Sequence, residues 1–190
     1  DFVPPAYRSM AFMDIEVPLL GNDAEEAVRR GHSMLQPRVE ARILQDLQVK
    51  ATDRVLEIGA GSGYMAALLA HRAERVVSLE INPELAEMAR ENLRDAGIQN
   101  ADVRQGDGAR DAIPDGPFDV IVLSGSVAEV PAALLALLKD GGRLGAIVGG
   151  EPVMRFTLTR RTGDRFETTA PWDTIAPRLV NFPEPSGFTF

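Results

Sequence analysis

Three glycine residues at alternating positions are the part of the sequence best suited to hold a ligand. Gly59, Gly61 and Gly63 follow a short apolar run at 55–58, and small and apolar residues continue through 65–70. This order is typical of a buried strand, a tight turn and a helix. Because glycine has no Cβ atom, the turn can come close to a ligand, which the N–H groups at the helix start then face. We therefore predict a nucleotide-type site here.

The spacing of these glycines distinguishes between classes of ligand. A dinucleotide fingerprint, Gly-x-Gly-x-x-Gly, would need its third glycine at position 64, which is Tyr64. The observed pattern of Glu57 followed by x-Gly-x-Gly-x-Gly resembles the loop of S-adenosylmethionine-dependent methyltransferases. An acid at this point suits a cationic ligand better than a pyrophosphate. We assign to the cofactor site the residues Glu57, Gly59, Ala60, Gly61, Ser62 and Gly63. The alternative is a strand-to-helix turn that binds nothing.

Acidic and hydroxyl side chains follow the next three predicted strands. Glu80 ends the second strand, 17 residues after the last glycine of the loop, where a carboxylate can accept both ribose hydroxyls of an adenosine. Asp107 follows the third strand, where it can accept the hydrogens of an adenine amino group. The predicted cofactor site also contains Ile81, Gly108 and Ser124, and the predicted acceptor site contains Ser126. Each of these also has an alternative without a ligand: a solvent-facing acid for Glu80, an Asp-Gly turn for Asp107 and a small-residue loop for 124–126.

Strands and helices alternate along the middle of the chain. The apolar pattern predicts strands at 55–58, 75–80, 101–105, 118–123 and 143–148, and helices at 65–70, 83–97 and 131–139. A helix begins at Pro37, a shorter one follows a cap at Asn22 or Asp23, and 32–37 is expected to be a loop. Period-two alternation at 153–160 predicts a hairpin with 166–169. The expected fold is α/β, a doubly wound, Rossmann-like, mostly parallel sheet with an antiparallel C-terminal hairpin.

Composition limits the classes of protein to consider. A chain of 190 residues with 45% hydrophobic residues is expected to form one domain, 1–190, made of an N-terminal arm (1–50), a cofactor-binding core (51–150) and a hairpin with a tail (151–190). No run approaches the ~20 apolar residues of a membrane span. The absence of cysteine excludes disulfides and cysteine-based zinc sites, and we expect a cytoplasmic protein without a metal centre. The net charge of −8 argues against binding of nucleic acid.

Motifs outside the glycine loop resemble the protein-L-isoaspartate O-methyltransferase family. The matching stretches are Phe2-Val-Pro4, Tyr7, Gln36-Pro37, 55–64, Gly106-Asp-Gly108, Phe118-Asp119, Val130-Pro131 and Gly141-Gly-Arg-Leu144. The resemblance implies S-adenosyl-L-methionine as cofactor and S-adenosyl-L-homocysteine as product. It also implies a peptide or protein carboxylate as acceptor, because the family methylates isoaspartyl residues and so starts their repair through a succinimide.

The sequence departs from the family at the predicted acceptor site. The family carries a Thr-Ile-Ser-Gln-Pro-like stretch, which reads Ser33-Met-Leu-Gln-Pro37 here, so Ser33 keeps the first hydroxyl and Leu35 replaces the second. Ser33 is the candidate catalytic residue, and we assign Leu35 to the substrate site. An acidic helix at 23–30 is expected to be an insertion. Two other functions stay open: a methyltransferase for a small molecule or a dedicated partner protein, and a cofactor-binding protein without turnover.

Overall fold

The structure, a computed structural model, describes residues 1–21 and 23–184 and is built on a seven-stranded sheet. In spatial order the strands are β5 (Ala101–Gln105), β4 (Arg75–Glu80), β3 (Arg54–Ile58), β6 (Phe118–Val127), β7 (Leu138–Gly150), β8 (Val153–Thr162) and β9 (Arg165–Asp173). The strands from β5 to β7 are parallel, and β8 and β9 are antiparallel to their neighbours. The predicted fold class is confirmed.

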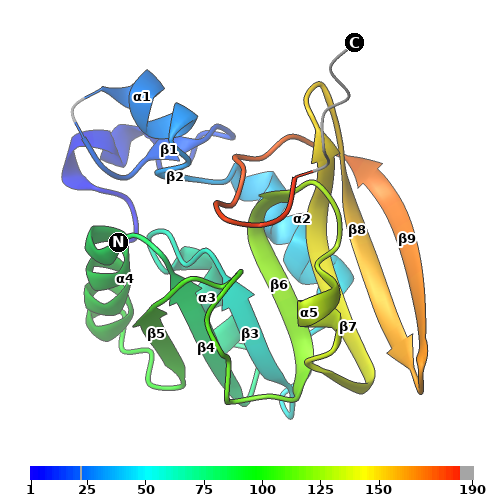
Figure 1. The fold of residues 1–190 in the computed structure, drawn as a ribbon. Helices are drawn as coiled ribbons and strands as arrows, with labels where there is room; N and C mark the ends of the chain where they lie inside the picture. Colours follow the sequence, from blue (N-terminus) through cyan, green and yellow to red (C-terminus); the bar gives the residue numbers. More distant parts are fainter. Residues whose placement is uncertain (22, 185–190) are drawn as a thin grey trace.

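The two faces of the sheet are buried in separate hydrophobic cores. The helices are α2 (Pro37–Leu47), α3 (Tyr64–Ala70) and α4 (Pro83–Asp95) on one face and the short α5 (Ala132–Leu135) on the other (Figure 1). Successive strand residues alternate between the faces: Val55 belongs to the core under the three longer helices, and Leu56 to the core under α5. Because both faces are covered, the central strands are nearly continuous apolar runs.

An N-terminal segment lies over the edge of the sheet where the parallel strands end (Figure 1). Its elements are the 3-10 helix η1 (Pro5–Met10), β1 (Val17–Pro18), α1 (Ala24–Arg29) and β2 (Ser33–Met34). Asp23 caps α1, because its carboxylate accepts hydrogen bonds from the backbone N–H groups of Glu25 and Glu26. The other candidate cap, Asn22, lies outside the described residues. The prediction of a loop throughout 32–37 is wrong, because β2 pairs with β1 across this stretch.

The predicted helix at 131–139 is also wrong beyond its first turn. Helix α5 covers only Ala132–Leu135, and β7 already begins at Leu138. Leu138 pairs with Phe118 at the start of β6, and both side chains are buried in the same core. A short apolar run fits a strand and a helix about equally well, so pairing with a neighbouring strand decides.

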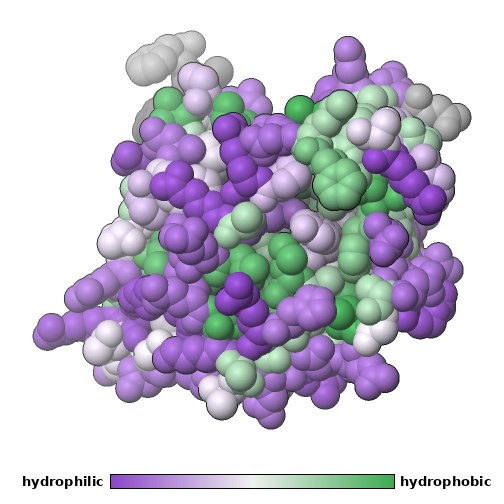
Figure 2. Space-filling view, turned by 180° about the vertical axis from the view of Figure 1, so that it is seen from behind, coloured by the Kyte–Doolittle hydropathy of each residue, from purple (hydrophilic) through white to green (hydrophobic). Residues whose placement is uncertain are grey.

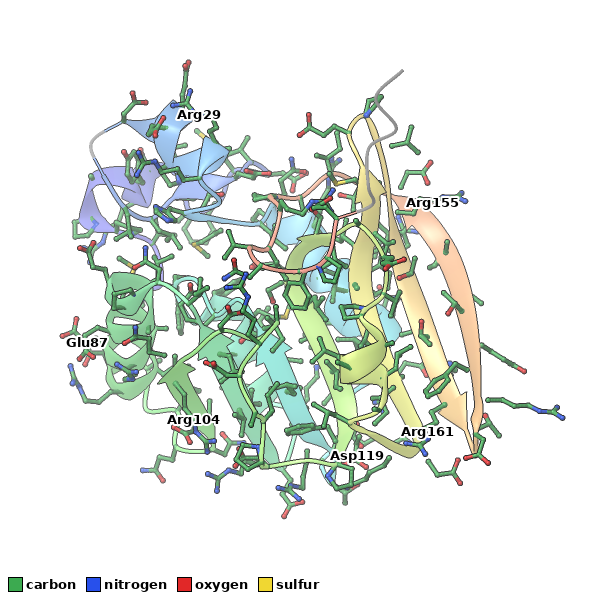
Figure 3. The ribbon with its side chains drawn as sticks, in the orientation of Figure 1. Arg29, Glu87, Arg104, Asp119, Arg155 and Arg161 are labelled. Atoms are coloured by element: carbon green, nitrogen blue, oxygen red, sulfur yellow. The ribbon has the colours of Figure 1, made fainter. Side chains whose placement is uncertain are left out.

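The surface of the molecule is rich in charged side chains. Figure 3 shows Arg104, Asp119 and Arg161 along the edge of the sheet opposite the N-terminal segment. Seen from behind, the surface is mostly hydrophilic, with hydrophobic residues gathered in patches, one of them on the side of the N-terminal segment (Figure 2).

Within residues 1–21 and 23–184, none of the helices combines the length and the apolar character that crossing a bilayer requires.

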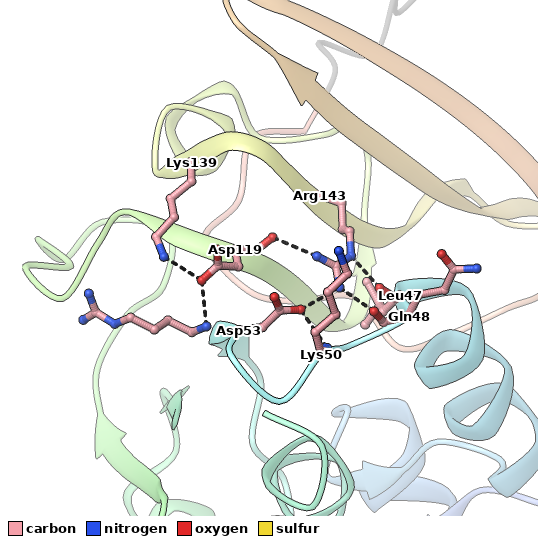
Figure 4. A network of polar contacts seen from close by, with 8 residues as sticks. Leu47, Gln48, Lys50, Asp53, Asp119, Lys139 and Arg143 are labelled. Atoms are coloured by element: carbon pink, nitrogen blue, oxygen red, sulfur yellow. Dashed lines mark hydrogen bonds and ion pairs between the residues drawn. The ribbon is translucent and has the colours of Figure 1, made fainter. Parts of the chain in front are cut away.

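A buried ion pair lies at the edge of the sheet opposite the N-terminal segment, and its arginine also joins the end of α2 to the sheet (Figure 4). Nη2 of Arg143 lies 2.7 Å from Oδ2 of Asp53, and both side chains are only 6% exposed. The same guanidinium donates hydrogen bonds to the backbone carbonyl oxygens of Leu47 and Gln48, which end α2. Gln48 has a left-handed backbone with φ of 48°. Arg143 therefore satisfies both a buried carboxylate and the orphan carbonyl groups of a helix terminus.

We expect Arg143→Met to lower the free energy of unfolding by about 3–5 kcal/mol, because it leaves Asp53 buried without its counter-charge. The matched control is Arg155→Met, since Arg155 pairs with Asp173 on the exposed surface of the hairpin. That change should cost less than about 1 kcal/mol. Urea denaturation measures both variants, and equal losses would contradict a special role for the buried pair.

Candidate active site

The glycine loop joins β3 to α3 in a conformation that other residues rarely adopt. Gly59, Gly61 and Gly63 have positive φ angles of 92°, 53° and 83°. The space is also restricted, because a Cβ atom at position 63 would lie 3.1 Å from the carbonyl oxygen of Ala89 in α4. Backbone strain and close packing therefore require glycine here. The loop leads directly into the N-terminus of α3, which carries a partial positive charge.

Glu80 connects this loop to the end of the neighbouring strand. One carboxylate oxygen accepts a hydrogen bond of 2.9 Å from the N–H of Gly61, and the other accepts one of 3.0 Å from the N–H of Asn82. The side chain is only 6% exposed, yet it lines a cleft at the strand ends. A carboxylate offers about four lone-pair positions, so each oxygen can accept a further hydrogen bond from a ligand.

The cleft at the carboxyl edge of the sheet, which we call the edge cleft, has a volume of about 120 Å³. Its lining includes 30–33 of the N-terminal segment, Gly59 and Gly61, 80–82, 106–108, Ser124, and 178–180 with Phe182 near the C-terminus. The edge cleft thus brings together eight residues predicted from the sequence: Ser33, Gly59, Gly61, Glu80, Ile81, Asp107, Gly108 and Ser124. They come from far apart in the chain and meet because parallel strands end at one edge.

Asp107 is held in place by two donors. Its Oδ1 accepts a hydrogen bond of 2.9 Å from the N–H of Ala109, and its Oδ2 accepts one of 2.8 Å from the side-chain amide of Asn181. The remaining lone pairs can accept hydrogens from a ligand. Gly108 packs closely beneath, since a Cβ atom there would lie 2.6 Å from a methyl carbon of Ile58.

Glu57 is fully buried and lies beneath the loop, not in the edge cleft. Its two carboxylate oxygens accept hydrogen bonds from the hydroxyl groups of Ser78, at 2.6 Å, and Ser124, at 2.8 Å. Burial raises the pKa of Glu57 to about 7; these hydrogen bonds lower the pKa in part, and the charge of Glu80 raises it further. Near neutral pH this carboxyl group is therefore protonated in a large fraction of the molecules.

Two further spaces adjoin the edge cleft. A small cavity of about 20 Å³ is lined by Ala60 and Ser62 together with Glu57, Leu35 and Glu40. A groove of about 490 Å³, which we call the N-terminal groove, runs along Asp1–Val3 of the arm, 11–14 and α2, and it shares Met34, Leu35 and Tyr64 with the small cavity. Leu35 therefore stands between the small cavity and the groove. The hydroxyl of Ser33 donates a hydrogen bond of 3.3 Å to Glu16.

Ser126 is placed differently from the prediction. It is fully buried, its hydroxyl has no partner among the described residues, and it lines none of the three spaces above. Its backbone instead holds the C-terminal segment, residues 174–184: its N–H donates to the carbonyl oxygen of Pro177, and its carbonyl oxygen accepts from the N–H of Leu179. We therefore do not assign Ser126 to the acceptor site.

Two parts of the site were missed from the sequence. The C-terminal segment lines the edge cleft through 178–180 and Phe182, and no motif marks it. Glu40 had a visible signal, because it lies on the same helical face as Ile43 and Leu47, where an apolar residue is expected. Among the described residues, no group of three or more His, Cys, Asp or Glu side chains is arranged to hold a metal ion.

Solved structures share this arrangement. A structure of a protein-L-isoaspartate O-methyltransferase superposes with a TM-score of 0.78 at 26% identity, over 93% of this chain and 56% of that chain. A chain from Plasmodium falciparum, solved in complex with S-adenosyl-L-homocysteine, shares the fold with a TM-score of 0.75 at 19% identity, over 90% of this chain and 83% of that chain. The fold and the site define an S-adenosylmethionine-dependent methyltransferase of the α/β class.

Residues 1–175 match the family model described as Protein-L-isoaspartate(D-aspartate) O-methyltransferase, so the chain belongs to this family. A protein-L-isoaspartate O-methyltransferase of Methanoculleus marisnigri is 41% identical over 168 residues, which cover 88% of this chain and 72% of that protein. Another, of Myxococcus xanthus, is 38% identical over 168 residues, 86% of this chain and 75% of that protein.

The raised pKa of Glu57 gives a prediction about stability. Because the folded chain holds this proton up to a pH of about 7 and the unfolded chain releases it near 4.5, the stability from Glu57 is present below pH 4.5 and is lost as the pH rises to 7. We expect this group to lower the free energy of unfolding by about 3 kcal/mol between pH 4.5 and pH 8. Glu57→Gln should remove this part of the pH dependence, as measured by urea denaturation without ligand.

The control for this prediction is Glu167→Gln, since Glu167 is exposed on β9. This variant should follow the wild-type dependence on pH. An unchanged slope in Glu57→Gln would show that Glu57 titrates alike in the folded and unfolded states and would contradict the prediction.

Proposed function

We propose that this chain transfers a methyl group from S-adenosyl-L-methionine to the side-chain-like carboxylate of isoaspartyl residues in peptides and proteins. The observation that carries the proposal is the match to the family model over residues 1–175, which include the glycine loop, Glu80 and Asp107 as well as the N-terminal groove. The donor site and a second space beside it are thus both within the matched region.

Residues of the edge cleft offer matching groups to the adenosine part of the cofactor and to the start of its methionyl part. The free lone pairs of Glu80 suit the two ribose hydroxyls, and those of Asp107 suit the adenine amino group. Ile81 is 40% exposed next to Glu80 and offers an apolar surface to the adenine ring. The glycine loop lets the backbone approach the methionyl part. When bound, the cofactor supplies an electrophilic methyl group on a positively charged sulfur.

The chain's own task is to position the acceptor and to keep water out. An acceptor carboxylate is already ionised at neutral pH, so no general base is needed. Of the histidines, His32 lines the edge cleft, and its Nε2 atom already lies 3.4 Å from the side-chain nitrogen of Asn82. This contact agrees with a reaction in which His32 does not act as a base. The N-terminal groove adjoins the small cavity at Leu35, so a peptide in the groove would present its carboxylate there. Alignment of the two reactants supplies most of the rate enhancement.

The test is incubation with methyl-labelled S-adenosyl-L-methionine and two peptides that differ only in one isoaspartyl or aspartyl linkage. We expect base-labile label in the isoaspartyl peptide alone. Label in a small molecule or in one partner protein only would contradict the isoaspartyl substrate and favour a different acceptor. Cofactor binding with no label in any acceptor would indicate a binding protein without turnover.

A prediction about rate follows from Leu35, which replaces a hydroxyl that the family places beside the acceptor. A hydrogen bond to a charged group contributes about 1.5–3 kcal/mol, so Leu35→Ser should raise the rate on the isoaspartyl peptide by about 10- to 100-fold. The matched control is Leu35→Ala, which makes the same space without a hydroxyl and should give no comparable rise. Leu35 is buried, so thermal stability is measured alongside. A fast wild type that slows in Leu35→Ser would overturn the argument.

A further inference from the structure

Glu40 is a buried acid for which the described residues supply no ion pair. It lies on the inner face of α2 among apolar residues and is only 5% exposed. Its Oε2 atom is buried and accepts no hydrogen bond from any described residue. A buried carboxylate without a donor costs several kcal/mol, so such a group is rarely kept in a core without a use.

The basic residues next to Glu40 in the sequence are engaged elsewhere. Arg38 pairs with Asp14 of the N-terminal segment, and Arg42 lies over the ring of Trp172. The nearby Glu57 differs from Glu40, because each of its oxygens already accepts a hydrogen bond, one from the hydroxyl group of Ser78 and one from that of Ser124. Glu40 therefore lines the small cavity with an acceptor oxygen that no described residue satisfies.

The space beside Glu40 is small and leads toward the edge cleft. The small cavity of about 20 Å³ exceeds the roughly 10–15 Å³ that one water-sized group needs. It shares Ser33, Gly59, Gly61 and Ser124 with the edge cleft. One compact group on a ligand that lies along the glycine loop can therefore reach Glu40.

The chemistry of the small cavity selects a cation with N–H donors. Glu40 and Glu57 both line it, and burial favours the neutral form of each acid in the free protein. A cation beside them favours their ionised form and is attracted to it, whereas an anion would add a third buried acidic group without a counter-charge. Of the two charged groups at the methionyl end of the cofactor, the carboxylate is excluded on this ground and the α-ammonium fits. We propose that Glu40 binds the α-ammonium group of the cofactor through its unpaired carboxylate oxygen. The inference rests on the proposed function only in that it takes the edge cleft to be the cofactor site.

The titration of Glu40 agrees with this assignment. Burial, and then the charge of Glu57, raise the pKa of Glu40 well above the ordinary value of 4.5. Tyr64 also lines this space, and burial, followed by the charge of Glu40, raises the pKa of its hydroxyl. An ammonium group between the acids offsets this repulsion, so the ligand supplies the counter-charge that the free protein lacks.

The test measures binding of three probes to wild type and to Glu40→Gln by calorimetry. The probes are S-adenosyl-L-homocysteine, its desamino analogue, which keeps the carboxylate, and 5′-methylthioadenosine, which lacks the amino-acid group. We expect Glu40→Gln to bind S-adenosyl-L-homocysteine about 10- to 100-fold more weakly and the other two probes with unchanged affinity. Without ligand, the variant should be at least as thermally stable as wild type, because the amide cannot ionise and so avoids the cost of burying a charge.

The control variant is Glu91→Gln, which changes an exposed acid on α4 and should bind all probes like wild type. Equal loss for all three probes would mean that Glu40 acts through the fold and would overturn the proposal. Unchanged binding with slower methylation would place Glu40 on the acceptor side and would also overturn it. A wild type that binds S-adenosyl-L-homocysteine but leaves isoaspartyl peptides unmethylated would contradict the proposed function alone.

Discussion

The arrangement of the active site depends on the carboxylate of Glu80. It bridges the N–H groups of Gly61 and Asn82 and so ties the glycine loop to the end of β4. Without this bridge, two partly buried N–H groups would lose their partner. The loop, whose three glycines have positive φ angles, would keep the hydrogen bonds from Gly59 and Ala60 to the carbonyl oxygen of Leu79 but lose the contact that fixes Gly61. The same side chain faces the edge cleft, so one group both shapes the loop and presents acceptors to a ligand.

Acids gather where the chain must accept a positively charged cofactor. Glu40, Glu57 and Glu80 lie around the glycine loop, and burial raises the pKa of the first two. Such a cluster lowers stability in the free protein. Stability comes instead from the two cores that cover the sheet and from the bonded pair of Arg143 and Asp53 at the opposite edge. Binding of the cofactor and stability of the fold thus depend on opposite edges of the same sheet.

The parts of the site that sequence predicts are those fixed by local chemistry. The glycine loop, Glu80 and Asp107 each follow a strand whose apolar pattern is visible, and a parallel sheet brings strand ends together. The C-terminal segment could not be predicted, because Asn181 reaches Asp107 across 74 positions of sequence through tertiary packing. Ser126, which the sequence predicts for the acceptor site, is buried because strand β6 continues through it. Glu40 was detectable as an acid on an apolar helix face, but its use depends on a cavity that only the fold creates.

The central claim is that Glu80 organises a site for an adenosyl cofactor, and calorimetric titration of wild type and Glu80→Gln tests it most directly. The account predicts that wild type binds S-adenosyl-L-homocysteine at one site and does not bind NAD. Glu80→Gln, which turns an amide toward one of the two backbone donors, should bind about 1–3 kcal/mol more weakly. Equal affinity in both proteins, or binding of NAD by wild type, would contradict the account.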